Sequence, residues 1–499
     1  MLRLIPPPPQ AMGILRKAGI RAQERQLQAH STQTLMSLAG LSAARLALAI
    51  APHARRVWVA AGPGNNGGDG LEAACHLHRW GIPVQVSLMA APDQLPDDAL
   101  AAWKKAVARG VPLNGEPDPL WVEQMDERDL CLDALLGIGA HRPPSGRMQS
   151  WVSLLNRSAA PVLALDVPTG LDADSGQVWA GPAGPQQAVQ AHTTLTFVAA
   201  KPGLLMGHGR DLCGNLWLDP LTSACPSPVP PAHPDAVFNT PTTAAARRHA
   251  SHKGSQGDVA IVGGESRAMQ GMAGAAILAA QAALHGGAGR VYLSLLGEPG
   301  VHQNIPTDAM PRPLDQLNLG SLTVVAGCGA GQAIQALLPD ILRNSARLVL
   351  DADGLNALAH NPSWLAQLRA RGEARPTVIT PHPLEAARLL NCSTQEVQND
   401  RLGAAQTLSR TLQCTVVLKG SGSVIASPDH LPRINTSGNG KLAIGGTGDV
   451  LAGWLGALLG QGQGAHQAAC AAVWRHGHAA DEWPDHVALT ASRLAQQLY

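Results

Sequence analysis

The sequence predicts an α/β protein with two domains, each a mainly parallel sheet covered by helices. Short apolar strands alternate with helical patterns along most of the 499 residues, which is the arrangement that parallel sheets with crossover helices produce. A glycine-rich segment leads into a helical run in each half, at 62–70 and again at 438–449. A proline-rich stretch separates the halves, and a chain of this length exceeds what one core usually supports.

Composition excludes several classes of function. The net charge is +1 and aromatic residues are only 3%, so neither a basic surface nor a base-stacking surface for nucleic acid is expected. No uninterrupted apolar run has the length of a membrane span or of a signal peptide, so we expect no membrane partner and a cytoplasmic location. The eight cysteines never stand at Cys-x-x-Cys spacing, which argues against zinc and for free thiols in a reducing compartment.

The first half opens with a helical pattern over 22–51, followed by a buried strand at 57–61. The glycine-rich segment 62–70 is expected to be a loop, with a helix after it. Alternating strand and helix patterns then continue; the strands are expected at 84–89, 129–136 and 161–166, and a helix at 97–109.

Two of these strands carry an aspartate near the carboxyl end, Asp133 and Asp166. Because the carboxyl ends of parallel strands meet at one edge of a sheet, we expect both to lie near Asn66 and Thr169. Carboxylate, amide and hydroxyl oxygens are hard ligands for a cation, and they are also hydrogen-bonding groups for a sugar. The alternative interpretation is that each aspartate only caps the turn that follows its strand.

The segments 65–70, 137–143 and 166–172, together with Lys201-Pro202-Gly203-Leu204, resemble the NAD(P)H-hydrate epimerase family. The resemblance implies a Rossmann-like three-layer domain that binds potassium through Asn66, Asp133 and Thr169. It also implies a site for the hydrated nucleotide, with Asp166 as a catalytic residue. Ile138 stands where the family usually has threonine, so one hydrogen bond to the ligand is missing or made by the backbone. The implied nucleotide-binding residues are Asn65, Asn66, Gly67, Gly68, Asp69, Gly137, Ile138, Gly139, Ala140, His141, Arg142, Pro143 and Asp166.

Six prolines between 220 and 234 have no helical or strand periodicity around them. Such a segment is typical of a linker stiffened toward polyproline II. We therefore place the first domain at residues 1–225, the linker at 226–240 and the second domain at 241–499.

The second half repeats the alternation of strand and helix. Strands are expected at 259–264, 291–295, 323–326 and 348–353, with a small-residue helix at 271–284. The segment 377–385 is expected to be a strand, a turn and the start of a helix, and 415–425 a strand, a Gly/Ser turn and a second strand. The strand ends carry residues that could form a second site: Gly329, Asp351, His382, Lys419 and Asp449.

Glycines at 445, 446 and 448 precede the apolar run 450–459, which we interpret as the start of a buried helix. Unpaired N–H groups and the positive end of the helix dipole make such a start a phosphate site. Asp449, the carboxylate beside it, is placed to accept a hydroxyl proton. The alternative is that Asp449 is only the N-cap of the helix.

The motifs at 253–257, 327–331, 351–356, 380–383 and 445–449 resemble the ADP- or ATP-dependent NAD(P)H-hydrate dehydratase family of the ribokinase-like superfamily. Cys328 and Ala330 depart from the usual Pro and Leu. The resemblance implies a catalytic Asp449 and two sets of binding residues. Those for the hydrated nucleotide are Ala275, Gly329, His382 and Asp449, and those for the adenine nucleotide are Lys419, Gly420, Ser421, Gly422, Ser423 and Gly448.

The two resemblances together imply a bifunctional enzyme that repairs hydrated NADH and NADPH. The first domain would interconvert the epimers, and the second would dehydrate the S form while ADP yields AMP and phosphate. Potassium in the first domain and magnesium in the second are the implied cofactors. Two other interpretations stay open: a small-molecule kinase with a regulatory first half, and a non-catalytic nucleotide sensor. Self-association and the preference between NADH and NADPH hydrates are not determined by the sequence.

Overall fold

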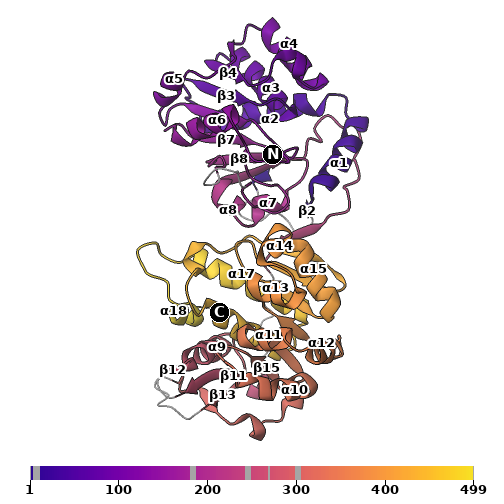
Figure 1. The fold of residues 1–499 in the computed structure, drawn as a ribbon, viewed down its shortest axis with the longest axis vertical. Helices are drawn as coiled ribbons and strands as arrows, with labels where there is room; N and C mark the ends of the chain where they lie inside the picture. The colour runs from indigo at the N-terminus through magenta and orange to yellow at the C-terminus, as the bar shows by residue number, and fades with distance from the viewer. Residues whose placement is uncertain are drawn as a thin grey trace. The chain divides into compact units, whose positions relative to one another are not determined.

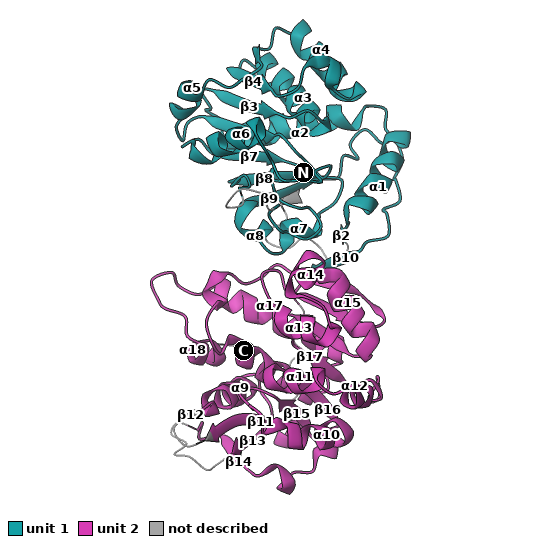
Figure 2. Ribbon diagram, viewed as in Figure 1, with its two compact units in different colours: residues 1–238 teal, residues 239–499 magenta. Residues whose placement is uncertain are grey.

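The computed structural model describes residues 2–3, 12–179, 187–241, 249–267, 270–297 and 305–497. The chain divides into two compact units, residues 1–238 and 239–499 (Figure 2). Each unit is a sheet with helices packed on it (Figure 1). The predicted fold class, α/β with two domains, is confirmed.

The sheet of the first unit has eight strands in the order β1-β9-β8-β7-β6-β3-β4-β5. All neighbours from β9 to β5 are parallel, and β1 is antiparallel to β9. The strand order reverses beside β3, so the carboxyl ends of β3 and β6 flank a crevice of the kind that binds ligands in open α/β sheets. The strands are β1 (Leu2–Arg3), β3 (Val57–Ala61), β4 (Val84–Leu88), β5 (Leu113–Asn114), β6 (Leu130–Ala134), β7 (Val162–Leu165), β8 (Thr193–Phe197) and β9 (Asn215–Asp219).

The helices of this unit are α1 (Lys17–His30), α2 (Leu35–Ile50), α3 (Asn65–Arg79), α4 (Asp97–Ala108), α5 (Pro119–Glu123), α6 (Arg147–Arg157), α7 (Pro202–Leu205) and α8 (Gly209–Leu212). The prediction of one helix over 22–51 is wrong, because the chain breaks between α1 and α2. Thr34 starts the second helix by accepting a hydrogen bond from the Ser37 N–H at 3.2 Å. A hydroxyl N-cap of this kind begins a new helix.

The prediction of a loop over 62–70 is also wrong in part. Helix α3 begins at Asn65, so the asparagines and glycines form its first turns. Glycine costs helix stability of about 0.5–1 kcal/mol relative to alanine, but here it allows close packing. A Cβ on Gly67 would lie 2.1 Å from the Gly62 carbonyl oxygen. Tight backbone contact therefore decides the conformation against the local propensity.

The chain around residues 230–237 is attached to the start of the first unit. Strand β10 (Ala236–Asn239) pairs antiparallel with β2 (Gly13–Ile14) through Ala236 and Val237. The Asp235 carboxylate accepts a hydrogen bond from the Arg16 N–H at 2.8 Å, and Gln23 donates to the Pro230 carbonyl at 3.2 Å.

In the second unit the strand order is β14-β13-β11-β15-β16-β17-β18-β19-β20, and β12 pairs with β11. The strands from β14 to β18 are parallel, and β19 and β20 continue antiparallel. They are β11 (Asp258–Arg267), β12 (Gln270–Gly271), β13 (Arg290–Gly297), β14 (Ala309–Pro311), β15 (Thr323–Ala326), β16 (Arg347–Leu350), β17 (Thr377–Ile379), β18 (Thr415–Leu418), β19 (Val424–Ser427) and β20 (His430–Asn435).

The helices of the second unit are α9 (Ala273–His285), α10 (Ile334–Asn344), α11 (Ala352–Ala359), α12 (Pro362–Arg369), α13 (Pro383–Leu390), α14 (Thr394–Asn399), α15 (Arg401–Leu412), α16 (Thr447–Gly460), α17 (Ala465–Asp481) and α18 (Ala491–Gln496). Helix α16 is the central helix of the unit, and the prediction of a buried helix over 450–459 is confirmed because every residue from Val450 to Leu459 is buried. Its glycines let α9 approach closely; a Cβ on Gly453 would lie 2.0 Å from the Ala279 carbonyl oxygen.

All eight cysteines are free, and six of them are buried, as the sequence predicted. Within the described residues, no single helix is long and apolar enough to cross a membrane. Helices α1 and α2 meet the length and composition criterion only as a pair, and they are bent by 102° at the break between them.

We expect a chain of residues 1–238 to be more stable than one of residues 1–225. The shorter chain lacks β10 and the hydrogen bonds of Asp235 and Pro230 to α1 and its start. Losing about 1–2 kcal/mol from a unit of this size lowers Tm by about 4 °C or more. Thermal melting followed by circular dichroism measures the difference, and equal Tm values would show that the 230–237 segment does not stabilise the unit.

Candidate functional sites

The predicted cluster at the carboxyl edge of the first sheet is formed. The Asp133 carboxylate accepts hydrogen bonds from the Thr169 N–H and hydroxyl, both at 2.8 Å, and from the Leu135 N–H at 3.2 Å. Burial raises the pKa of Asp133 to about 6, although these hydrogen bonds oppose the shift. An ionised carboxylate held in so buried a place benefits from a nearby cation.

Asp166 follows β7 directly and has the left-handed φ of 66°, which is a strained conformation for this residue. Its carboxylate accepts from the Ile138 N–H at 2.9 Å and from Lys201 Nζ at 2.6 Å. The backbone of Gly137 lies so close that a Cβ there would come within 2.6 Å of Asp166 Oδ2. Glycine at 137 is therefore required for this placement of the carboxylate.

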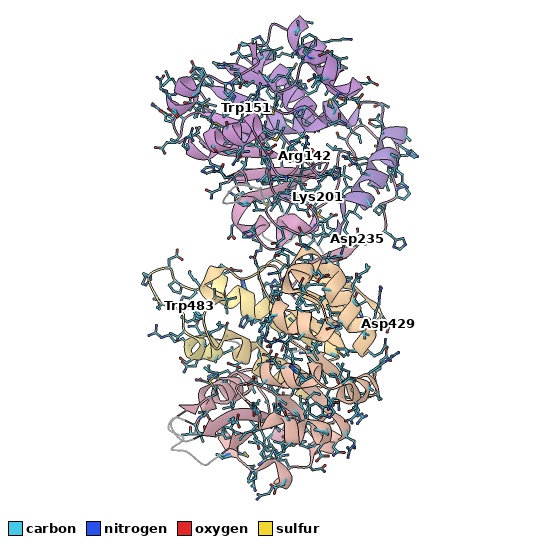
Figure 3. All side chains as sticks on the ribbon, viewed as in Figure 1. Arg142, Trp151, Lys201, Asp235, Asp429 and Trp483 are labelled. Carbon is cyan, nitrogen blue, oxygen red and sulfur yellow. The ribbon has the colours of Figure 1, made fainter. Side chains whose placement is uncertain are left out.

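Lys201 is the residue of this site that the sequence reasoning did not assign to it (Figure 3). Its ammonium is fully buried and also donates to the Thr196 hydroxyl at 2.6 Å and the Phe197 carbonyl at 2.8 Å. All three donors are thus used, and one of them forms a charge-assisted hydrogen bond with the Asp166 carboxylate. The position of Lys201 in the Lys-Pro-Gly-Leu motif is the sequence feature that could have indicated its place in this site.

Asn66 and Asp69 lie in the first turns of α3. The amide of Asn66 is buried, and neither its nitrogen nor its oxygen has a hydrogen-bond partner among the described residues. Such orphaned polar atoms indicate a missing ligand. Burial, and next the charge of Asp166, raise the pKa of Asp69 well above its ordinary value, which favours the protonated form of this carboxyl group.

A cavity of about 440 Å³ opens at this edge of the sheet. It brings together part of the predicted nucleotide set: Asn65, Asn66, Asp69, Gly137, Ile138, Gly139, Ala140 and Asp166. The other predicted residues do not line it: Gly67, Gly68, His141, Arg142 and Pro143. Gly67 packs on the backbone of Gly62, and Gly68 packs against the Met36 side chain. These two glycines therefore allow α3 to pack closely on its neighbours and do not line the cavity.

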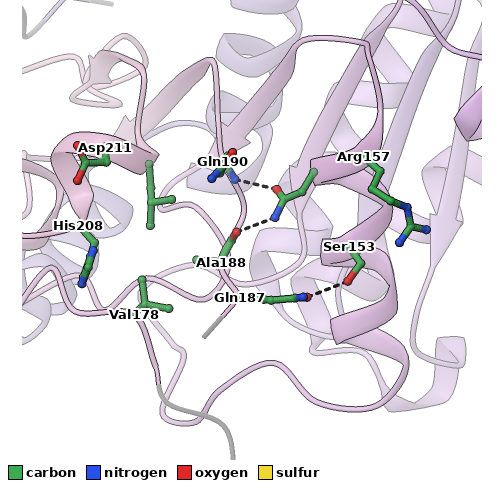
Figure 4. A pocket seen from close by; sticks show the side chains of 10 residues that line it. Ser153, Arg157, Val178, Gln187, Ala188, Gln190, His208 and Asp211 are labelled. Carbon is green, nitrogen blue, oxygen red and sulfur yellow. Dashed lines mark hydrogen bonds between the residues drawn. The ribbon is translucent and has the colours of Figure 1, made fainter. Parts of the chain in front are cut away.

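A second cavity of about 590 Å³ lies elsewhere in the first unit (Figure 4). Its walls are held by hydrogen bonds from Asn156 to the Ala188 carbonyl and from Ser153 to Gln187, at 2.9 and 2.8 Å. Ala188 precedes β8 and Leu212 precedes β9, so this cavity adjoins the amino ends of those strands. It contains no residue that the sequence analysis assigned to a site, and the smaller cavity is the better candidate.

The second site lies at the start of α16. Gly446 is the N-cap residue with φ 93°, and it has no side chain to cap the helix. Thr447 uses its hydroxyl for the Leu442 and Ile444 carbonyls instead, at 3.0 and 3.2 Å. Asp449 is the third residue of the helix, so the interpretation of Asp449 as the N-cap is wrong. The first N–H groups stay available for an anion.

Around Asp449 the structure gathers acidic and basic groups. Burial, and next the charge of Asp351, raise the pKa of Asp449 to about 6, while a hydrogen bond with Cys328 and the charge of Lys419 lower it. Lys419 Nζ donates to Asp351 Oδ1 at 2.6 Å. Gly448 lies against this pair, because a Cβ there would be 3.4 Å from Lys419 Nζ. A carboxylate with a pKa near neutrality beside a cation and a free helix start suits general-base chemistry on a phosphorylated ligand.

The predicted nucleotide loop, residues 419–423, joins β18 to β19. The buried guanidinium of Arg401 stabilises this loop by donating hydrogen bonds to three backbone carbonyls, those of Leu418, Lys419 and Gly422, at 3.3, 3.2 and 3.4 Å. The Ser423 hydroxyl donates to the Gly420 carbonyl at 3.1 Å. The sequence reasoning missed Arg401, whose partners are 17 to 21 positions away.

Of the predicted substrate residues, Gly329 and Ala275 are neighbours; a Cβ on Gly329 would lie 2.9 Å from Ala275 Cβ. His382 caps α13 by accepting from the N–H groups of Leu384 and Glu385 at 3.1 and 3.3 Å. Burial, and next the charge of Lys419, lower the pKa of His382, so the imidazole is neutral. Burial raises the pKa of Glu385 to about 7, which adds an acidic group that the sequence analysis did not assign.

His476 is a second buried side chain that positions part of this site and that the sequence analysis did not assign to it. Its Nε2 lies 2.9 Å from the Thr447 carbonyl in a buried position. Burial lowers its pKa to about 4, so the ring is neutral and donates Nε2–H to that carbonyl. The bond fixes the first turn of α16 from α17. Among the described residues, no group of three or more His, Cys, Asp or Glu side chains is arranged to hold a metal.

Comparison with known proteins covers both units. The family model described as NAD(P)H-hydrate dehydratase matches residues 259–499, and the YjeF-related protein N-terminus matches residues 32–203. The bifunctional NAD(P)H-hydrate repair enzyme Nnr of Escherichia coli is 36% identical over 463 residues, which cover 90% of this chain and 84% of that protein. The chain belongs to the family of bifunctional NAD(P)H-hydrate repair enzymes.

Other members of this repair family match in the same way. The enzyme of Thermofilum pendens is 34% identical, with 90% of this chain and 87% of that protein covered. That of Leishmania braziliensis is 33% identical, with 90% and 84% covered. Among solved structures, the ADP/ATP-dependent NAD(P)H-hydrate dehydratase of Bacillus subtilis, co-crystallised with ATP and Mg²⁺, is 28% identical with a TM-score of 0.44; the match covers 51% of this chain and 92% of that one.

In this repair enzyme, Arg401→Met is expected to destabilise the second unit and weaken nucleotide binding. Methionine keeps the apolar packing of the side-chain stem but leaves the Leu418, Lys419 and Gly422 carbonyls without their donor. Unsatisfied buried groups cost about 1–3 kcal/mol each, so a total loss of about 3 kcal/mol or more is expected.

Urea unfolding and calorimetric titration with ADP measure the two effects. Arg410→Met is the matched control, because Arg410 is on the same helix and exposed. If Arg401→Met and Arg410→Met bind ADP equally well, the guanidinium does not position the loop.

Proposed function

We propose that the first unit is the epimerase domain and the second the dehydratase domain of this repair enzyme, with the sites described above as their active sites. The observation that carries the proposal is Asp449, a carboxylate with a pKa of about 6 at the uncapped start of α16. Its surroundings match what removal of a hydroxyl through a phosphate ester requires. We keep the domain limits proposed from the sequence, residues 1–225 and 241–499, for the two catalytic segments.

In the first unit, the cavity beside Asp166 receives the hydrated nicotinamide nucleotide. Asn65, Asn66 and the backbone of 137–140 bind it. Asp166, which pairs with Lys201, is the proton acceptor in this proposal, and Asp69, whose pKa is raised by burial, is the proton donor. Two carboxyl groups in such different surroundings, one paired with a lysine and one with a raised pKa, suit an interconversion that passes through a ring-opened or dehydrated form.

Potassium would be held by Asn66, Asp133 and Thr169 in this unit. The fit rests on the orphaned amide of Asn66 and on the buried Asp133 carboxylate, whose burial calls for a compensating charge. An oxygen-lined site of this kind suits a hard cation. Bound there, the ion would orient the loop that carries Thr169 and Asp166.

In the second unit, Asp449 accepts the proton of the substrate hydroxyl as the oxygen attacks the terminal phosphorus of ADP. The bond from that phosphorus to its bridging oxygen breaks, and AMP leaves. The N–H groups at the start of α16 and Lys419 stabilise the charge of the transferring phosphoryl group. The lone pair of the ring nitrogen then expels phosphate, and loss of the neighbouring carbon-bound proton restores the double bond.

The nucleotide would lie on residues 419–423 and Gly448, the loop that Arg401 supports. Magnesium is expected to arrive with the phosphates, because no three-residue set of protein ligands is arranged for it in the described part of the chain. The eight free thiols support a cytoplasmic location, and the expected partners are small molecules alone.

The direct test adds chemically hydrated NADH and ADP to the full chain. Return of reduced-nicotinamide absorbance, with one AMP and one phosphate for each NADH formed, is the expected result. A stable phosphorylated product, found by mass spectrometry, would instead identify a small-molecule kinase.

Asp449→Asn is expected to reduce dehydration by about 10² to 10⁴ in rate, which is the usual worth of general-base help. Asparagine has nearly the same size and the residue is not the N-cap, so the helix start is kept. ADP binding and epimerisation are expected to be unchanged. Asp429→Asn, the same charge change at an exposed position (Figure 3), is the control. Dehydration within about threefold of wild type would contradict the role.

The pH dependence follows from the same group. Because the pKa of Asp449 is raised to about 6, the carboxyl is protonated below that pH and cannot accept the hydroxyl proton. Dehydration kcat/KM should therefore fall as pH drops through about 6, and Asp449→Asn should lack this limb. A profile that is flat between pH 5 and 7 in wild type would assign the proton to another group.

Potassium should accelerate epimerisation, and Asp133→Asn should abolish that acceleration. Asn keeps the shape but removes the buried charge that the cation balances. Rates in potassium and in tetramethylammonium chloride at equal ionic strength give the comparison, with exposed Asp93→Asn as control. Equal rates in the two salts would show that no ion acts at this site.

A further inference from the structure

Helix α1 contributes a row of polar side chains to the epimerase cavity that no part of the proposed mechanism uses. Arg21, Glu24, Arg25 and Gln28 all line the cavity. They are spaced i, i+3, i+4 and i+7, which places them on one face of a helix. The opposite face, with Ile20, Gln23 and Leu27, is buried. The helix is thus amphipathic, with its polar face toward the ligand space.

The start of this helix is fixed to the rest of the unit by polar contacts. The Lys17 N–H donates to Asp174 Oδ1 at 2.9 Å, and Lys17 Nζ pairs with Asp172 at 2.5 Å. The Arg16 N–H donates to Asp235. Because Asp172 and Asp174 follow Thr169 on the loop after β7, the contacts connect α1 to the active-site edge of the sheet. The polar face is therefore held in place before any ligand arrives.

The cavity lining contains more acidic than basic side chains, and α1 supplies its two arginines. The lining residues include the carboxyl groups of Glu24, Asp69, Asp98 and Asp166. Two lining residues are cationic, Arg21 and Arg25. A hydrated dinucleotide carries a diphosphate, and NADPH hydrate a further phosphate, so binding beside these carboxyl groups needs local positive charge.

Arg21 and Arg25 differ in the contacts that their guanidinium groups make within the protein. Arg21 Nη1 pairs with Glu24 at 3.0 Å, while its Nη2 lies over the predicted nucleotide loop, 3.4 Å from where a Cβ on Gly139 would stand. Arg25 is exposed and makes no ion pair with any other residue in the described part of the chain. Arg21 thus presents a guanidinium donor beside Gly139, and Arg25 adds a second guanidinium to the cavity lining.

We propose that Arg21 and Arg25 bind the phosphates of the hydrated dinucleotide in the epimerase site. The planar guanidinium matches phosphate oxygens through paired hydrogen bonds. The proposal rests on the proposed epimerase function, and it adds residues outside the family-model match, which starts at residue 32. It makes α1 a substrate-binding element, and it divides the substrate into a nicotinamide end at Asp166 and a phosphate end under α1.

The test uses the full chain without ADP or ATP, so that only epimerisation runs. The purified R epimer of NADH hydrate is the substrate, and the S epimer is followed by chromatography. We expect the double variant Arg21→Gln, Arg25→Gln to raise KM by about ten- to hundredfold, the worth of one or two charged hydrogen bonds, with kcat within about threefold. Arg25→Lys, which keeps the charge but loses the paired hydrogen bonds of the guanidinium, should raise KM less than Arg25→Gln does.

Arg45→Gln is the matched control, because Arg45 is an exposed arginine on α2 that does not line the cavity. The KM of wild type should rise with salt, and that of the double variant should rise less. Hydrated nicotinamide mononucleotide, which has a single phosphate, should be less affected by the double variant than the dinucleotide.

Comparison of NADH and NADPH hydrates separates the two phosphate sources. Equal losses assign the arginines to the diphosphate, and a loss confined to NADPH hydrate assigns them to the 2′-phosphate. An unchanged KM in a double variant with wild-type melting, or a fall in kcat alone, would overturn the proposal. Absence of epimerisation in wild type would overturn the proposed function, and this inference with it.

Discussion

Helices α3 and α16, at the two candidate sites, each start at a glycine that has no side chain to cap them, Gly64 and Gly446. The first N–H groups of a helix need partners, and here neither N-cap side chain supplies one. Both starts lie beside carboxylates whose pKa values are raised by burial, Asp69 and Asp449. The proposed role of each site depends on this constraint, because phosphate and hydroxyl oxygens are suited to pair with the N–H groups of a helix start.

The same solution recurs in two units that use it differently. In the first, Lys201 pairs with Asp166 while burial raises the pKa of Asp69, an arrangement that suits the proposed rearrangement without group transfer. In the second, Lys419 and the α16 N–H groups surround a single base, which suits phosphoryl transfer. The order of the two units along one chain matches successive steps on one substrate.

Much of this could be predicted from the sequence, because strand ends and glycine positions are local signals. The buried strands and the grouping of Asp133 with Thr169 follow from apolar runs and parallel topology. The buried polar anchors could not be predicted in the same way. Arg401 and His476 act through partners up to 29 positions away, and no local pattern distinguishes them from other Arg and His residues.

Two errors have a common physical cause. Glycines at 67, 68 and 70 suggest a loop by propensity, but contact with the Gly62 backbone and Met36 makes them helical. The leucine stripe over 35–46 suggests one long helix, but the Thr34 hydroxyl starts a new one there. In both places a specific contact determines the local structure against the intrinsic secondary-structure propensity of the residues.

The central claim is that the R epimer must pass through both sites in order, whereas the S epimer needs only the second site. The most direct measurement gives the pure R epimer of NADH hydrate, with ADP, to wild type and to Asp166→Asn, and follows the NADH formed after the uncatalysed epimerisation is subtracted. We expect wild type to convert the R epimer fully. Asp166→Asn should leave the R epimer unused while dehydrating the S epimer at the wild-type rate. Conversion of the R epimer by Asp166→Asn at the wild-type rate would contradict the account.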